Sequence, residues 1–403
     1  MTNALCSTFR ATSTVALCLS LLACATGQPT PPSTPPTTPL TLHLRLIGET
    51  SLPHRLNYQG TTVGGLSALD YDPVKNLWFA LSDDRSDLQP ARFYSMRLAI
   101  TAEGIAPPQL VGVTTLRQAD GQAFPSRRQE PNGVVPDPEG LRWRAQTGTL
   151  LWSSEGDIQH GTDPSVCEMR PDGTHLRCLD LPAHLRADRT GASGPRDNLT
   201  LEGLATTPDG RGVWAAMENA LVQDGPMPTL NAPGGPSRIT LFDVGSGKPV
   251  AQRAYVTDAI PAAPVPPQTF ADNGISEILA IDAFRLLVLE RSFTAGVGNS
   301  LRLYQVDTRD GSDTLQQDTL APGTWQPMRK TLVANLDDFV ALNGQPRPGL
   351  RRLDNTEGMA WGPRIMGKNG RPGPRTLVLI SDDNFNARQT TQIIAFEFLE
   401  SAP

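Results

Sequence analysis

The sequence predicts an all-β protein built from repeated four-stranded antiparallel sheets, and three observations carry this prediction. The 403 residues include 36 Gly and 37 Pro, a turn-dense composition that a helical protein does not have. No long stretch has the apolar spacing of an amphipathic helix, and residues 333–342 are the best candidate for a short one. From about residue 41 onward the chain consists of short apolar strands and turns, and these strands recur in similar units.

Five units share one layout. Each has a short strand that begins at Glu-Gly-Leu or its equivalent, a turn, and a mostly apolar strand that ends in a carboxylate. The units cover residues 65–84, 139–155, 202–219, 276–290 and 357–384. Two further strands follow, at 91–98 and 109–116 after the first unit and at 238–244 and 250–255 after the third. Repeated sheets of four antiparallel strands are the layout of a β-propeller. We therefore expect about five blades, and a sixth within 302–350 stays open.

The two ends of the described repeat predict how the ring closes. The last unit has one clear strand after its carboxylates, at 391–400. A strand at 41–48 can supply the missing outer strand, which would remove the last open sheet edge. We expect residues 41–403 to form one propeller domain closed by an N-terminal strand.

The first forty residues predict export. Residues 1–23 have the layout of a signal peptide, with one Arg, no acidic residue and an apolar run too short to span a bilayer. The run ends in Leu-Leu-Ala-Cys, which resembles a bacterial lipobox, so we expect Cys24 to carry a lipid. Residues 24–40 are rich in Pro, Thr and Ser and predict an extended tether. The protein is therefore expected in the cell envelope, bound to the membrane only through its lipid. An ordinary cleaved signal and a secreted protein are the alternative.

Two cysteines remain for the folded domain. Cys167 and Cys178 flank a Pro-Asp-Gly turn signal, and two strands leaving that turn would bring them opposite each other. We expect a disulfide across this hairpin, because an exported protein meets an oxidising compartment. Two unrelated reduced thiols are the alternative.

The charge distribution restricts the partners. The net charge is −6, and no run of Lys and Arg occurs. A groove that follows nucleic-acid phosphates is therefore not expected. We expect the folded domain to be a monomer.

The carboxylates of the repeat form the candidate site. The first strand of a blade lies innermost and the second returns to the same end, so both sets should meet at one mouth of the channel. Equal spacing supports this, because Glu139 and Glu155 lie 16 residues apart, as do Glu202 and Glu218. The expected metal ligands are Asp83, Asp84, Glu155, Glu218, Glu277, Glu290, Asp382 and Asp383, and the expected catalytic carboxylates are Glu139, Glu202 and Glu357.

Oxygen ligands without His or Cys favour Ca²⁺, with Mg²⁺ second. The structural alternative is that these carboxylates cap strand ends and pair with nearby arginines. The candidates are Arg85, Arg142, Arg196, Arg291 and Arg352.

The repeated motifs resemble the phytase-like family described as having esterase-like activity. The most specific stretches are Asp-Asn-Thr-Glu-Gly-Met-Ala at 354–360, Leu-Ile-Ser-Asp-Asp-Asn-Phe-Asn at 379–386 and Asn-Leu-Thr-Leu-Glu-Gly-Leu at 198–204. The resemblance implies a propeller that hydrolyses phosphoesters or phosphodiesters, so the expected substrate is a phosphorylated small molecule or an ester. Carried over by position, the family's acidic residues are Glu139, Glu202 and Glu357 with Asp83, Asp84, Asp382 and Asp383. This sequence departs from the pattern at Gly65, which replaces a Glu, and at Glu277, which lies in Ser-Glu-Ile.

The sequence contains no rival catalytic motif: no G-x-S-x-G, no H-E-x-x-H and no P-loop. A divalent-metal-dependent phosphoesterase is therefore the first hypothesis, with the ester held by Arg85, Arg142, Arg196 and Arg352. The alternative is a non-catalytic binding propeller with structural carboxylates. A carboxylic-ester or lactone hydrolase with one bound Ca²⁺ is a third class.

Overall fold

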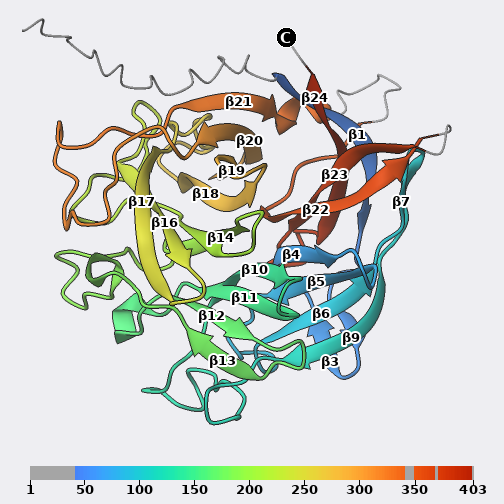
Figure 1. Cartoon of the computed structure of the whole chain (residues 1–403), viewed down its shortest axis with the longest axis horizontal. Helices are drawn as coiled ribbons and strands as arrows, with labels where there is room; N and C mark the ends of the chain where they lie inside the picture. Colours follow the sequence, from blue (N-terminus) through green and yellow to red (C-terminus); the bar gives the residue numbers. More distant parts are fainter. Residues whose placement is uncertain (1–40, 341–348, 368–370, 402–403) are drawn as a thin grey trace, which may run out of the picture.

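The structure, a computed structural model, describes residues 41–340, 349–367 and 371–401. Five four-stranded antiparallel sheets stand in a ring, so the protein is a five-bladed β-propeller (Figure 1). This confirms the predicted fold class and decides the number of blades. The expected signal peptide, lipidated Cys24 and tether lie outside the described residues.

Blades one to four each take their strands from consecutive chain segments, with the first strand innermost. Blade one contains β4 (Leu66–Asp72), β5 (Leu77–Ser82), β6 (Arg92–Arg97) and β9 (Gln109–Thr115). Blade two contains β10 (Pro138–Arg144), β11 (Thr149–Ser154), β12 (Ser165–Met169) and β13 (His175–Cys178). Blade three contains β14 (Leu201–Thr206), β15 (Gly212–Met217), β16 (Pro236–Asp243) and β17 (Lys248–Val256). Blade four contains β18 (Ala271–Ala280), β19 (Arg285–Thr294), β20 (Gly298–Asp307) and β21 (Lys330–Asn335).

Blade five closes the ring with strands from both ends of the described chain. It contains β22 (Thr356–Met366), β23 (Pro372–Ser381), β24 (Gln392–Ser401) and, outermost, β1 (Thr41–Ser51). β1 pairs with β24 from Thr41 opposite Ser401 to Ser51 opposite Gln392. The predicted closure by an N-terminal strand is confirmed. The segment 302–350 supplies outer strands of blade four, so it holds no sixth blade among its described residues.

Short elements decorate the blades. They are the hairpins β2 (Leu56–Tyr58) with β3 (Thr61–Val63) and β7 (Ile100–Thr101) with β8 (Gly104–Ile105), and the 3-10 helices η1 (Ile158–His160), η2 (Ala183–Leu185) and η3 (Leu336–Phe339). Only η3 falls within the expected helix at 333–342, because β21 extends the sheet of blade four to Asn335. None of the helices in the described residues is long and apolar enough to cross a membrane.

The hydrophobic core consists of five clusters, one between each pair of neighbouring blades. Between blades one and two, for example, Phe79 and Phe93 pack against Leu141 and Trp152. Strands buried on both faces explain why the second strand of each unit is almost continuously apolar. This packing holds the five innermost strands, and the polar residues at their ends, around one axis.

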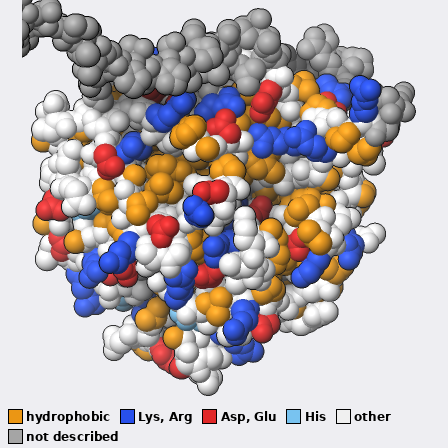
Figure 2. All heavy atoms as spheres, in the orientation of Figure 1, with side chains coloured by type: hydrophobic (Ala, Val, Ile, Leu, Met, Phe, Trp, Pro, Cys, Tyr) orange, Lys and Arg blue, Asp and Glu red, His pale blue; other side chains and the backbone are white. Residues whose placement is uncertain are grey.

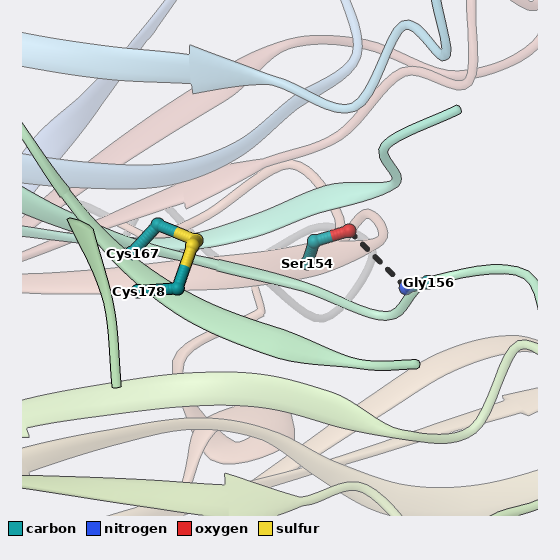
Figure 3. Close-up of a disulfide and its surroundings, with 4 residues drawn as sticks. All are labelled: Ser154, Gly156, Cys167 and Cys178. Carbon is teal, nitrogen blue, oxygen red and sulfur yellow. Dashed lines mark hydrogen bonds between the residues drawn. A yellow bond between two sulfur atoms is a disulfide. The ribbon is translucent and has the colours of Figure 1, made fainter. Parts of the chain in front are cut away.

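The predicted disulfide is present. Cys167 in β12 and Cys178 in β13 lie directly opposite each other and are bonded (Figure 3). On the neighbouring strand β11, Ser154 accepts a hydrogen bond from the backbone N–H of Gly156 at 3.1 Å, where the chain turns away from the channel. The disulfide between Cys167 and Cys178 ties together β12 and β13, the two outer strands of blade two.

Candidate metal and ester site

A β-bulge at the same point of every innermost strand aims the candidate residues. In blade two, Pro138 lies opposite Ser154 and Leu141 opposite Trp152, so Glu139 bulges out of the pairing. The pairing shifts at the equivalent point in the other four blades. A bulge bends its strand and redirects a side chain. The Glu of each Glu-Gly-Leu motif is thereby turned toward the mouth of the channel.

The Gly of the motif is required by close packing between blades. A Cβ on Gly140 would lie 2.6 Å from the Glu202 carbonyl oxygen of the next blade, and a Cβ on Gly203 would lie 2.6 Å from the Ile278 nitrogen. No side chain fits at such distances. The motif therefore combines a tight contact between blades with an aimed carboxylate.

The strand register shows which residues are equivalent in the five blades. The bulge positions are Ser67, Glu139, Glu202, Ser276 and Glu357. The positions that follow the paired end of the second strand are Asp83, Glu155, Glu218, Arg291 and Asp382. The prediction for the fourth unit is wrong by one residue. Ser276 and Arg291 occupy the positions that were expected for Glu277 and Glu290. In the first unit the equivalent residue is Ser67, two residues after Gly65.

Eight of these ten positions, all but Ser67 and Ser276, line one cavity of about 1300 Å³ at the mouth of the channel. Its described lining includes twelve carboxylate residues and four arginines. The carboxylates are Asp83, Asp137, Glu139, Glu155, Asp197, Glu202, Glu218, Asp272, Asp337, Asp354, Glu357 and Asp382, and the arginines are Arg85, Arg291, Arg352 and Arg388. The excess of acidic groups means that this cavity needs bound protons or cations.

Burial and mutual repulsion raise the pKa values of these carboxyl groups. Burial raises the pKa of Glu218 to about 8 against the opposing charge of Arg291, and it raises the pKa of Asp137 to about 7 against that of Arg85. Burial followed by the charges of Glu155 and Glu218 raises the pKa of Glu202 well above its ordinary value. The pKa values of Asp83, Glu139, Glu155, Glu357 and Asp382 are raised as well, with burial the largest cause in each.

Two groups of carboxylates have the spacing of cation ligands. Oxygens of Asp137, Glu139 and Glu155 lie within 4.8 Å of one another, and so do oxygens of Glu155, Glu202 and Glu218. Oxygen ligands of Ca²⁺ lie about 2.3–2.6 Å from the ion, so two ligands of one ion are at most about 5 Å apart. Glu155 belongs to both groups. The donor set is all oxygen and suits Ca²⁺ or Mg²⁺.

Arg291 is the cation within the acidic ring. Its Nη2 lies 3.3 Å from Glu218 Oε1 and 3.7 Å from Glu357 Oε1. Burial lowers the pKa of Arg291, but the charges of Glu357 and Glu218 outweigh it and the net pKa lies above its ordinary value. Opposite Arg291, Asn355 Nδ2 donates to Glu357 at 2.9 Å and to Asp382 at 3.3 Å. The Oδ1 atom of Asp83 is buried and has no hydrogen-bond partner in the described chain, so it is free to bind a ligand.

Two predicted ligands beside the cavity make structural contacts instead. Asp84 is bound by Arg92 at 2.6 Å and accepts three backbone N–H bonds from residues 87–89. It points away from the cavity because successive side chains of an extended chain point in opposite directions and Asp83 faces the cavity. Asp383 accepts the N–H of Gly65 at 2.9 Å and lies 3.4 Å from His54. Neither residue lines the cavity.

Glu290 is likewise turned away from the cavity. Lys330 and the Tyr255 hydroxyl each approach its Oε1 at 2.6 Å, and Asn273 donates to Oε2 at 2.9 Å. The Arg291 side chain takes the cavity position because it follows Glu290 in the strand.

Arg142 and Glu277 lie below the cavity and connect blades across the channel. Their charged atoms are 2.7 Å apart, and both side chains are only 1% exposed. Arg142 also donates to the carbonyl oxygens of Leu69 and Ile278, and Glu277 accepts the N–H of Leu204 at 3.0 Å. Burial raises the pKa of Glu277 to about 7 against the charge of Arg142. This pair therefore links blades one to four and gives neither residue access to a ligand.

The remaining predicted arginines lie at or beyond the rim. Arg85 bridges Asp137 at 3.2 Å and Asp157 at 3.3 Å. Arg352 binds Asp354 at 2.6 Å and lines the cavity. Arg196 donates to the carbonyl oxygens of residues 220 and 225 and does not line it.

Sequence reasoning missed several charged residues that line the cavity in the described chain, and it named Arg291 only as a structural partner of the acids. The missed residues are Asp137, Asp197, Asp272, Asp337, Asp354 and Arg388. Asp137 precedes the bulge by two residues, at the position of Asn355 in blade five, and aligning these polar residues could have revealed it. Arg291 could have been found by aligning the apolar residues of the fourth unit with the others. Asp272 has no counterpart in the repeat that would have marked it.

The structure thus defines a β-propeller with a buried acidic cavity at one mouth of its channel. The chain belongs to the phytase-like family, described as "esterase-like activity of phytase", whose model matches residues 61–385. A comparison with curated proteins finds no match.

Among solved structures, similar folds occur at low sequence identity. The Pseudomonas aeruginosa periplasmic gluconolactonase PpgL is 15% identical, with 90% of this chain and 100% of that chain covered and a TM-score of 0.36. The exo-β-1,3-galactanase 1,3Gal43A of Clostridium thermocellum is 8% identical, with 88% and 62% covered and a TM-score of 0.42. Such similarities carry no argument about the chemistry of this chain.

Proposed function

We propose that this protein is a divalent-cation-dependent phosphoesterase that hydrolyses phosphate mono- or diesters in the acidic cavity. One observation carries the proposal: two groups of three buried carboxylates share Glu155 and have the spacing of cation ligands. Membership of a family described by an esterase-like activity supports the same class of reaction.

The side chains divide into two roles. Asp137 and Glu155 in one group, or Glu155 and Glu218 in the other, would hold a cation, for which Ca²⁺ is the first candidate and Mg²⁺ the second. A divalent cation held there supplies positive charge to the phosphate oxygens and acidifies a water molecule. Glu139 and Glu202, whose pKa values burial and neighbouring carboxylates raise, can hold or accept a proton. Arg291 provides a guanidinium for the remaining phosphate oxygens.

The proposed location is the cell envelope, outside the cytoplasm. The disulfide between Cys167 and Cys178 supports this, because such bonds persist in oxidising compartments.

On the face shown in Figure 2, basic and acidic side chains are interspersed among apolar ones.

The test is hydrolysis of a panel of phosphomonoesters, phosphodiesters and lactones by the purified protein, with Ca²⁺, with Mg²⁺ and with EDTA. We expect phosphoester turnover that EDTA abolishes and that Glu155→Gln lowers at least a hundred-fold, in the range reported for loss of electrostatic stabilisation. Glu103→Gln, at an exposed hairpin turn, is the control and should keep full activity. Activity that persists in EDTA and in Glu155→Gln refutes the proposal.

The same panel separates the alternatives. Thermal stabilisation by Ca²⁺ without turnover of any ester would assign the protein to the non-catalytic binding class. Turnover confined to the lactones would assign it to the lactone hydrolases. The contacts of Asp84, Glu290 and Asp383 favour a partly structural role for the repeated acids, and the panel decides whether the cavity acids share it.

A further inference from the structure

One wall of the acidic cavity is apolar and comes from the inner hairpin of blade four. β18 begins five residues before its bulge residue Ser276, whereas β4, β10, β14 and β22 begin one residue before theirs. The β18–β19 hairpin therefore extends past the ring of acids. Phe293 in this extension, Phe270 directly before β18 and Val297 in the turn between β19 and β20 all line the cavity.

The apolar groups of this wall are exposed although the backbone that carries them is fixed. Phe270 is 63% exposed and Val297 57% exposed, and the rings of Phe270 and Phe293 lie 6.1 Å apart. The Phe270 carbonyl accepts the N–H of Ala295 at 2.9 Å, and the Phe293 N–H donates to Asp272 at 2.9 Å. An exposed apolar patch beside a polar cavity is typical of a ligand-binding surface.

The wall is continuous with Arg291, the least exposed of the four arginines that line the cavity in the described chain. Arg291 and Phe293 are two residues apart in β19, and alternate residues of a strand share one face. The same face therefore runs outward from the guanidinium to the phenyl rings. An anionic group at Arg291 would carry its organic substituent directly onto the wall.

We propose that the cavity selects phosphodiesters that carry an apolar substituent, either aryl or alkyl. This substituent packs on Phe270, Phe293 and Val297, and the inference rests on the proposed function. The charges of the cavity support the choice. Twelve carboxylates against four arginines repel a polyanion, whereas a diester carries a single negative charge. The expected substrate is therefore a monoanionic diester with one apolar group, and a multiply phosphorylated compound is disfavoured.

The test measures binding separately from turnover. Calorimetry with Ca²⁺ present compares diphenyl phosphate with dimethyl phosphate, which have the same charge and differ in the apolar groups. We expect diphenyl phosphate to bind about ten-fold more tightly, from the burial of one ring against the wall. Phe270→Ser and Val297→Ser should each reduce this preference and leave the affinity for dimethyl phosphate unchanged. Phe284→Ser is the matched control, because Phe284 is 49% exposed in the turn at the opposite end of the same hairpin.

Equal affinities for the two ligands would overturn the inference, as would a preference that both wall variants retain. Failure of the proposed function gives a different result. If bis(4-nitrophenyl) phosphate is not hydrolysed while diphenyl phosphate still binds in a Phe270-dependent manner, the wall is a ligand-binding surface and only the hydrolysis is refuted.

Discussion

Without divalent cations, the protein should lose stability as the pH rises from 5 to 8. The cause is Glu218. Burial raises its pKa from 4.5 to about 8, although the positive charge of Arg291 acts in the opposite direction. A carboxyl group with a higher pKa in the folded than in the unfolded state stabilises the fold fully below the unfolded pKa. That contribution is lost as the pH rises through the folded pKa, so the relevant window begins near 4.5 and ends near 8.

The magnitude follows from the size of the shift. One pKa unit corresponds to about 1.4 kcal/mol, so the Glu218 carboxyl alone removes about 3 to 4 kcal/mol of unfolding free energy between pH 5 and pH 8. Asp137, with a pKa raised to about 7 mainly by burial, acts in the same direction and over the lower part of this window. Because the two carboxyls belong to one coupled cluster, their contributions do not simply add.

The assay is urea unfolding in EDTA at pH 5, 6, 7 and 8, followed by the same series with Ca²⁺. Glu218→Gln cannot ionise and should flatten the decline, whereas the exposed control Glu103→Gln should keep it. Ca²⁺ should restore stability most at pH 8, because cation binding displaces protons that are already absent there. An unfolding free energy that is constant or rises from pH 5 to 8 in EDTA would refute the reasoning, as would an unaltered decline in Glu218→Gln.

Three further outcomes are expected. Glu155→Gln should lower the Ca²⁺ affinity at least ten-fold in calorimetry, because Glu155 belongs to both carboxylate groups; an unchanged isotherm would contradict the site. Arg142→Met should lower the unfolding free energy by about 3–5 kcal/mol in urea, since it leaves the Glu277 carboxyl buried and unpaired. Glu277→Gln in the same background should recover part of that loss, and no recovery would deny the pairing. Replacing Cys167 and Cys178 together by Ser should cost about 2–4 kcal/mol of stability, and a melting temperature insensitive to this change would deny the bond a stabilising role.

The fold could be predicted because it depends on patterns that recur along the chain. Repeated apolar strands and turn residues indicate about five blades, and the strand that closes the ring follows from the incomplete last unit. The hairpin cysteines were predictable because Cys167 and Cys178 flank a recognisable turn and end up in direct register. Each of these inferences uses local sequence and the two-residue period of a strand.

The site was less predictable because a shift of one residue reverses the direction of a side chain. Glu290 and Arg291 show this most clearly, since the bulge at Ser276 decides which of them faces the cavity. A sequence pattern that ends in a carboxylate selected Glu290, but the paired strands place Arg291 at the equivalent position. Asp272 escaped notice for another reason, because it lies on the extension of β18 that only blade four has.

The exceptions to the five-fold repeat divide the cavity into two halves. Both carboxylate groups with ligand spacing come from blades two and three, at Asp137, Glu139, Glu155, Glu202 and Glu218. Blade four opposes them with the Arg291 guanidinium and with the apolar wall beyond it. An identical acid in every blade would have produced a symmetric ring that binds cations and repels any anion. Replacing one acid by an arginine makes the charge distribution of the cavity asymmetric, because a cation is attracted to one side and an anion to the other. The proposed phosphate-ester substrate needs both, so blade four, with Arg291 where the other four blades have an acid, is more informative about the chemistry of this propeller than those blades.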